Sequence, residues 1–167
     1  MVRSNMNGLR RGRRTVLVAA ALGAASVAGI SAGGASAARG KHARATTVHV
    51  IEHAVTDTEV PSGGAKNKTG NVLTFHNKVF DAADKKQVGT DQGFCIRISP
   101  ADGSWECLWT TFLAHGQVTV EGPFFDTKNS VLAITGGTRA YRDARGEMNL
   151  NSRNGGKEFD FIFHIDA

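Results

Sequence analysis

Eight short runs of β-favouring residues constrain this chain more than any other feature of its sequence. Each run is rich in Val, Ile, Thr and Phe, and turn residues such as Gly, Pro, Asn and Asp separate it from the next. This is the pattern of strands joined by tight connections, and no longer segment has helical periodicity. The chain is therefore predicted to be all-β, with strands at about residues 46–55, 71–80, 88–99, 104–114, 117–124, 130–136, 144–151 and 158–165.

The last run indicates how these strands are arranged. Phe159, Phe161, Phe163 and Ile165 occupy alternate positions, so they share one face of a strand. An aromatic face of this kind must be covered, either by the interior of a barrel or by a partner subunit. Eight strands with mostly short connections favour a closed antiparallel up-and-down barrel or a sandwich, and closure leaves no exposed edge.

The first 37 residues have the layout of an export signal. Arginines at positions 10–14 precede an apolar, alanine-rich segment at 15–30, and Ala35-Ser36-Ala37 resembles a cleavage site. The apolar segment is too short for a stable membrane span, and Arg13-Arg14 leaves the general secretory and twin-arginine routes both open. We predict a signal at 1–37, a short basic linker at 38–45 and one barrel domain at 46–167 that is secreted.

Removing the signal changes the charge of the protein. Five of the 20 basic residues and none of the 15 acidic ones lie in residues 1–37, so the remaining chain holds 15 of each sign. A nucleic-acid-binding protein needs an excess of basic residues to neutralise phosphates. The balance excludes nucleic acid as the partner.

The two cysteines flank a predicted hairpin. Pairing residues symmetrically about Ala101 gives three opposed pairs, which are Ser99–Gly103, Arg97–Trp105 and Cys95–Cys107. Directly opposed residues lie close enough for a disulfide after a modest adjustment, and an exported protein with two cysteines favours the bond. The alternative is a free Cys95 thiol in a cavity.

The same hairpin places a cation beside two indoles. Arg97, Trp105 and Trp109 share a face with both cysteines. They form either a cation–π site in a pocket or the surface of a hairpin, and the sequence leaves both readings open.

Two other motifs resemble functional sites but do not fit the predicted strands. His49 and His53 match the H-x-x-E-H zinc pattern, yet on a strand they lie roughly 13 Å apart, too far for one metal ion. Gly136-Gly137-Thr138 lacks the following helix of a phosphate-binding loop. We predict no metal site and a simple turn at residues 136–138.

Four motifs in register resemble the allene oxide cyclase and dirigent families. Residues 133–138 with Tyr141 and 144–146 are similar to a hairpin that both families share. Phe75-His76-Asn77-Lys78, Gly89 with Gly93-Phe94-Cys95, and residues 116–122 are similar to cyclase segments at matching spacing. The resemblance covers about residues 48–165. It implies a lipocalin-like eight-stranded barrel, a homotrimer, no cofactor and an apolar substrate held in one shape.

The resemblance also implies roles for individual residues. Glu52 is the candidate catalytic carboxylate, Asn77 the amide that holds a water, and Cys95 the pocket cysteine. Phe124 stands where the cyclases have a tyrosine, so a hydroxyl is lost, and Ala54 replaces a second pocket asparagine. The candidate ligand-binding residues are Phe75, Arg97, Trp105, Trp109 and Phe124.

The predicted function is a secreted barrel that binds a lipid, polyketide or phenolic compound and directs its cyclisation or coupling. As an enzyme it would be a cofactor-independent isomerase or cyclase, because shape alone can impose a reactive conformer. The alternative is a non-catalytic secreted barrel that binds a ligand or has a structural role. A hydrolase is the third reading, and no nucleophile–base pair in the sequence supports it.

Overall fold

The computed structural model describes residues 45–166 of the 167-residue chain. The predicted export signal and nearly all of the predicted linker lie outside these residues, so both stay predictions. The described chain forms ten strands: β1 (Thr46–His53), β2 (Thr58–Val60), β3 (Val72–Phe75), β4 (Lys78–Asp81), β5 (Gln87–Ser99), β6 (Ser104–Leu113), β7 (Gly116–Phe125), β8 (Ser130–Gly137), β9 (Arg145–Arg153) and β10 (Glu158–Asp166).

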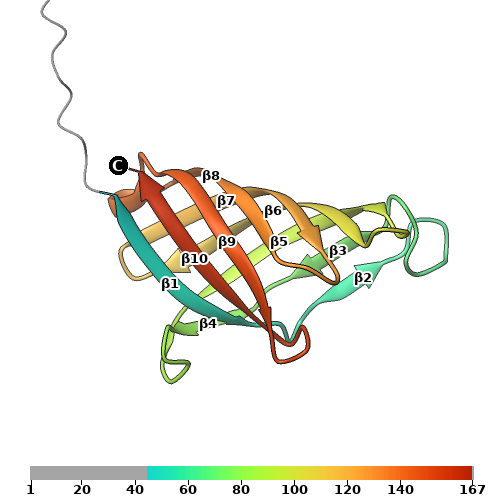
Figure 1. The fold of residues 1–167 in the computed structure, drawn as a ribbon, viewed down its shortest axis with the longest axis horizontal. Coiled ribbons are helices and arrows are strands. Elements are labelled where there is room, and N and C mark those ends of the chain that lie inside the picture. The colour runs from blue at the N-terminus through green and yellow to red at the C-terminus, as the bar shows by residue number, and fades with distance from the viewer. Residues whose placement is uncertain (1–44, 167) are drawn as a thin grey trace, which may run out of the picture. The chain divides into compact units, whose positions relative to one another are not determined.

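These ten segments form a closed barrel of eight antiparallel strands (Figure 1). β1 and β2 act as one interrupted strand, because β1 pairs with β4 while β2 pairs with β3. β3 and β4 are the two halves of the next strand, and both pair with β5. Pairing of β5 with β6 and of β1 with β10 closes the cylinder. The predicted all-β, up-and-down barrel is confirmed, and the sandwich is not formed.

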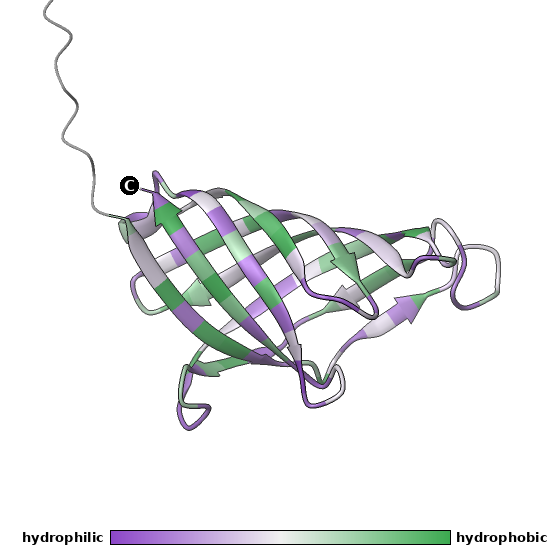
Figure 2. Ribbon diagram, in the orientation of Figure 1, coloured by the Kyte–Doolittle hydropathy of each residue, from purple (hydrophilic) through white to green (hydrophobic). Residues whose placement is uncertain are grey.

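Alternation along the strands places the core inside the barrel. On β10, Phe159, Phe161, Phe163 and Ile165 are buried, while Asp160 and His164 have at least part of their surface in solvent. The same alternation of apolar and polar residues is visible on neighbouring strands in Figure 2. In a barrel of eight strands the interior is just wide enough for side chains or one small ligand. The aromatic face predicted from the sequence is therefore covered by the rest of the same barrel.

The hairpin of β5 and β6 carries the predicted disulfide between Cys95 and Cys107. The register confirms two of the three expected pairs, Cys95–Cys107 and Arg97–Trp105. The third is wrong: Ser99 pairs with Ser104 rather than Gly103, since the register shifts between Arg97 and Ser99. An extra residue in β5 makes this bulge.

The disulfide gives the first testable prediction. Replacing Cys95 and Cys107 together by alanine is expected to lower the free energy of unfolding by about 3 kcal/mol, because the unfolded chain loses the closure of a loop of about a dozen residues. Chemical denaturation of the oxidised protein and of the variant measures this difference. The wild-type protein in a reducing agent should approach the stability of the variant, and the variant should not respond to the reducing agent. Equal stability of the oxidised wild type and the variant would contradict the prediction.

The predicted turn at residues 136–138 begins later than expected, because Gly136 and Gly137 are the last two residues of β8 and pair with β7. The chain turns from Thr138 through a single 3-10 turn, Arg139–Tyr141, into β9. Gly137 is needed for close packing, because a Cβ atom there would collide with the backbone oxygens of Gln117 and Tyr141. Within residues 45–166 there is no helix long and apolar enough to cross a membrane.

Candidate functional site

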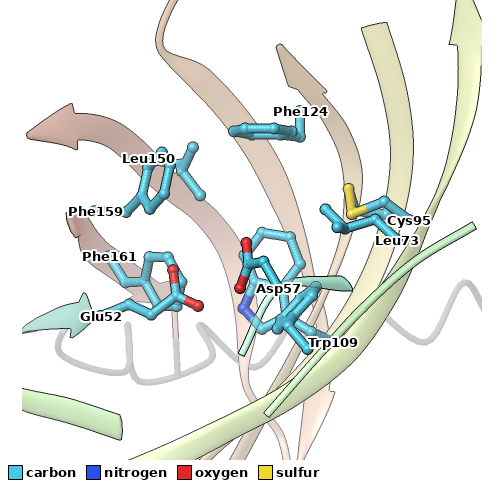
Figure 3. A pocket seen from close by; sticks show the side chains of 11 residues that line it. Glu52, Asp57, Leu73, Cys95, Trp109, Phe124, Leu150, Phe159 and Phe161 are labelled. Carbon is cyan, nitrogen blue, oxygen red and sulfur yellow. A yellow bond between two sulfur atoms is a disulfide. The ribbon is translucent and has the colours of Figure 1, made fainter. Parts of the chain in front are cut away.

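A small cavity of about 40 Å³ lies inside the barrel (Figure 3). This volume is large enough for a few water molecules and much smaller than an ordinary small-molecule site. Its wall is mostly apolar, with two carboxyl groups and a disulfide among aromatic rings. The lining residues are Glu52, Asp57, Leu73, Phe75, Cys95, Cys107, Trp109, Phe124, Leu150, Phe159 and Phe161.

The two carboxyl groups enter the cavity where the barrel wall is interrupted. Glu52 lies near the end of β1 and is buried. Asp57 lies in the link between β1 and β2 and is exposed on one side. The link at residues 54–57 faces a second interruption, at His76 and Asn77 between β3 and β4.

Asn77 joins these two interruptions through its side-chain amide. Its Nδ2 donates to Glu52 Oε1 at 2.7 Å and to Asp57 Oδ1 at 2.7 Å. Its Oδ1 accepts from the backbone N–H groups of Val55 at 3.0 Å and Thr56 at 2.9 Å. With both amide hydrogens donated to carboxylates, Asn77 positions Glu52 and Asp57. The water-holding role implied by the resemblance stays a prediction.

A third carboxyl group, that of Asp91 on β5, lies behind Asn77. The backbones of Asp91 and Asn77 exchange two hydrogen bonds, of 3.0 Å and 3.1 Å, and Asp91 Oδ1 also accepts from Asn77 N–H at 3.0 Å. The Asp91 side chain has no exposed surface. Its Oδ2 has no hydrogen-bond partner among the N–H and hydroxyl groups of the described residues.

Burial controls the protonation of all three carboxyl groups. It raises the pKa of Glu52 well above its ordinary value, and the negative charge of Asp91 raises that pKa further, against the opposing hydrogen bond from Asn77. Burial also raises the pKa of Asp91, to about 7. The pKa of Asp57 is raised by the same cause, but its exposure allows solvent to weaken the effect. Burial in an apolar cavity thus favours the protonated form of Glu52.

Aromatic rings form most of the remaining wall. Trp109 contacts Phe75 edge to face, with ring centroids 6.0 Å apart, and Phe161 at 5.4 Å. Gly93 is the cross-strand partner of Trp109, and a Cβ atom on Gly93 would collide with the Cβ and Cα atoms of Trp109. Trp109 Nε1 is buried and has no acceptor within residues 45–166. The cavity wall therefore offers an N–H donor as well as an acid.

The disulfide forms part of the same wall. Cys95 lies on the cavity, where the resemblance places its pocket cysteine, and it is bonded to Cys107. The sequence left two alternatives for Cys95, a disulfide or a free thiol in a cavity. Cys95 lines the cavity, as in the second alternative, but it is disulfide-bonded, as in the first. The free thiol is not formed.

Arg97 and Trp105 lie apart from the lining residues. Arg97 Cζ lies 3.7 Å from the centroid of the Trp105 ring, so the cation–π contact, one of the two readings left open by the sequence, is formed, although neither residue lines the cavity. Asp126, after β7, accepts from Arg97 Nη1 at 2.6 Å and from Trp105 Nε1 at 2.8 Å. This cluster ties the β7–β8 connection to the β5–β6 hairpin, and ligand binding by Arg97 and Trp105 stays a prediction.

The two histidines lie on β1, each beside an acid. His49 Nε2 lies 2.8 Å from Asp160 Oδ1, and His53 Nε2 lies 2.7 Å from Asp84 Oδ1. A group of three potential ligand atoms lies within 4.8 Å of one another, one each from His53, Asp84 and Glu158. His49 is not in this group, so the H-x-x-E-H spacing does not form a metal site among the described residues.

Sequence reasoning missed one carboxyl group on the cavity, that of Asp57, and one behind it, that of Asp91. It named six of the lining residues as site residues: Glu52, Phe75, Cys95, Cys107, Trp109 and Phe124. Asp57 belongs to an irregular link and carried no periodic signal. Asp91 had one: it is four residues before Cys95, so both side chains point to the same side of the strand. A charged residue on an inward-facing strand position is a signal of function or of special pairing.

Comparison with known proteins agrees with the barrel. A family model described as allene oxide cyclase matches residues 43–159. Among solved structures, a pyocyanin demethylase is 22% identical with a TM-score of 0.60, over 71% of this chain and 100% of that chain. A pterocarpan synthase dirigent protein is 25% identical with a TM-score of 0.58, over 74% and 87%.

An exo-specific intermolecular Diels-Alderase has the same fold at 12% identity, with a TM-score of 0.58 over 73% of this chain and 98% of that chain. The likeness to the Diels-Alderase and the demethylase shows the fold alone. The family match covers well over half of the chain, and it includes β1 to β9 with all three carboxyl groups around Asn77. This chain belongs to the allene oxide cyclase family.

Proposed function

We propose that the protein is an exported, cofactor-independent barrel that encloses an apolar small molecule and directs its cyclisation or coupling. The observation that carries this proposal is the buried Glu52 carboxyl group, which faces a cavity walled by aromatic rings. Solved relatives that are named as a pterocarpan synthase dirigent protein and a Diels-Alderase have the same barrel. The disulfide supports export to an oxidising compartment.

The two polar groups of the cavity specify the kind of guest. A protonated Glu52 donates a hydrogen bond, and so does the free Trp109 Nε1–H. An apolar guest with a carbonyl, ether or phenolic oxygen satisfies both donors, which a pure hydrocarbon cannot do. A lipid, a polyketide or a phenolic compound has such an oxygen.

The same groups supply the chemistry. Transfer of the Glu52 proton to the guest oxygen develops positive charge on the guest, and the Asp57 carboxylate at the mouth stabilises that charge. The aromatic walls hold the guest in one conformer, which can contribute several kcal/mol to the barrier without further chemical groups. General acid catalysis contributes about 100-fold or more to the rate.

The test begins with the guest. Mass spectrometry of an organic extract from natively expressed protein should identify an oxygenated apolar compound, or its product. With that compound or its precursor as substrate, Glu52→Gln should lower the turnover rate about 100-fold while binding persists. Glu121→Gln, an exposed carboxyl on β7, is the matched control and should turn over like the wild type. Equal turnover by Glu52→Gln would contradict the catalytic proposal.

One observation favours a second candidate, a non-catalytic binding barrel. A cavity of about 40 Å³ is smaller than a substrate of the proposed size, so the links around residues 54–57 and 76–77 must move to admit one. A compound that is recovered from the protein, binds to it again and is never converted by the wild type supports this candidate. The homotrimer also stays a proposal, which light scattering in solution tests.

A further inference from the structure

We infer that Glu52 and Asp91 form a carboxyl pair that shares one proton, with Asp91 as the positioning residue that keeps this proton on the cavity side. The inference deepens the proposed function, because it assigns a role to a residue that does not line the cavity. It rests on the geometry around Asn77 and on the hydrogen-bonding capacity of the two carboxyl groups.

The first step is the meeting of the two side chains. Glu52 comes from β1 and Asp91 from β5, and the interrupted strand of β3 and β4 lies between them. Asn77 occupies that interruption and donates to both: its side-chain N–H to Glu52 and its backbone N–H to Asp91. Both carboxyl groups are thus buried and bonded to the same residue.

The second step is the need for a proton. An ionised carboxylate only accepts hydrogen bonds, so two ionised groups cannot bond to each other. Asp91 Oδ2 is buried, and no N–H or hydroxyl group of the described residues reaches it. Without a guest in the cavity, a proton on Glu52 is the donor that fits this oxygen, and the oxygen of a bound guest competes with Asp91 for the same proton. The pair is therefore complete with one shared proton and one negative charge.

The third step is the surrounding charge. The ionisable groups that act on the pair are its own two members and Asp57, all of them acidic. Two like charges this close in a buried place oppose ionisation of the second group. Loss of the last proton is thus disfavoured by burial and by repulsion together.

The consequence for the reaction is a closed proton cycle. Glu52 gives its proton to an oxygen or carbon of the guest, which leaves both carboxyl groups ionised. Repulsion within the pair then favours return of a proton from another position of the guest to Glu52, and the starting state is restored. An isomerisation or cyclisation proceeds in this way without a net proton from water, an oxidant or a reductant.

The test is a titration of the carboxyl carbons by NMR in protein labelled with ¹³C at Asp and Glu. In the wild type, the carboxyl carbons of Glu52 and Asp91 should each report the same two steps, because coupled sites titrate as a pair. In Asp91→Asn, Glu52 should titrate in a single step at least about one pH unit lower than the upper step of the wild type. Asp102→Asn, an exposed acid in a turn, is the control and should leave Glu52 unchanged.

Single, independent steps near the ordinary values of Asp and Glu in the wild type would overturn the inference, even if the Asp91 variant does not fold. Glu52→Gln provides the reciprocal measurement, in which the pKa of Asp91 should fall. The titration needs no guest, so a shared proton in a protein without turnover contradicts only the proposed function. Where turnover exists, Asp91→Asn should also shift the alkaline decline of the turnover rate to lower pH. A merely structural role of Asp91 does not predict this shift.

Discussion

Replacing Asn77 by alanine is expected to lower the free energy of unfolding by several kcal/mol, because each buried polar group that loses its partner costs about 1–3 kcal/mol. The variant removes the donor to Glu52 and Asp57 and the acceptor for two backbone N–H groups in the link. A buried polar group that loses its partner carries its full desolvation cost. Denaturation by urea, followed by tryptophan fluorescence, measures the effect.

Asn151 on β9 provides the matched control, since it is half-buried and the structure gives its side chain no role in the site. Asn151→Ala should change the stability by less than about 0.5 kcal/mol. A similar small change for Asn77→Ala would show that Asn77 does not hold the two interruptions together. The comparison separates the loss of this network from the general cost of replacing asparagine in the barrel.

The second large effect is a loss of stability as the pH rises. The folded-state pKa values of Glu52 and Asp91 lie above those of the unfolded chain, so protonation of these groups stabilises the fold. The contribution of Asp91 is complete below about pH 4 and is lost as the pH rises through about 7, and that of Glu52 is lost as the pH rises through its own raised pKa. For Asp91, the rise from 3.8 to about 7 corresponds to a loss on the order of 4 kcal/mol.

Exposed acids act in the opposite direction. The pKa values of Glu59, Asp81 and Asp102 are lowered, mainly by hydrogen bonds to their ionised forms, so their contribution is lost as the pH falls. Denaturation curves between pH 4 and 9 should therefore show maximum stability on the acid side of neutrality. In the double variant Glu52→Gln, Asp91→Asn, the free energy of unfolding should fall much less as the pH rises above neutrality. An unchanged fall would contradict the raised pKa values of Glu52 and Asp91.

The barrel could be predicted from the sequence because its signal is local and periodic. Alternation at residues 158–165 fixes which face of β10 is buried, and the turn residues between runs fix where strands end. The cysteine pair followed from the same reasoning, since a hairpin brings Cys95 opposite Cys107 with few alternatives. The pair Ser99–Gly103 was misplaced because a bulge adds one residue without a clear sequence signal.

The site was harder to predict from the sequence because it depends on contacts between segments that are distant along the chain. Asn77 interrupts its own strand by bonding to residues more than 20 positions earlier, which no local pattern reveals. The sequence correctly predicted which side of its strand Arg97 lies on. It did not reveal the partner of Arg97, Asp126, because that residue lies in the connection after β7. Asp91 shared the inward face with Cys95, yet its meeting with Glu52 required the curvature of a closed sheet.

The bond between Cys95 and Cys107 also determines how far two neighbouring strands can slide. It lies two residues from the Gly93–Trp109 pair, in the same hairpin. A shift of β6 along β5 would move the Cα and Cβ atoms of Trp109 off the glycine that makes room for them and turn this side chain out of the cavity wall. The covalent link forbids that slip, so oxidation of the two thiols also fixes the alignment that keeps Trp109 in the cavity wall.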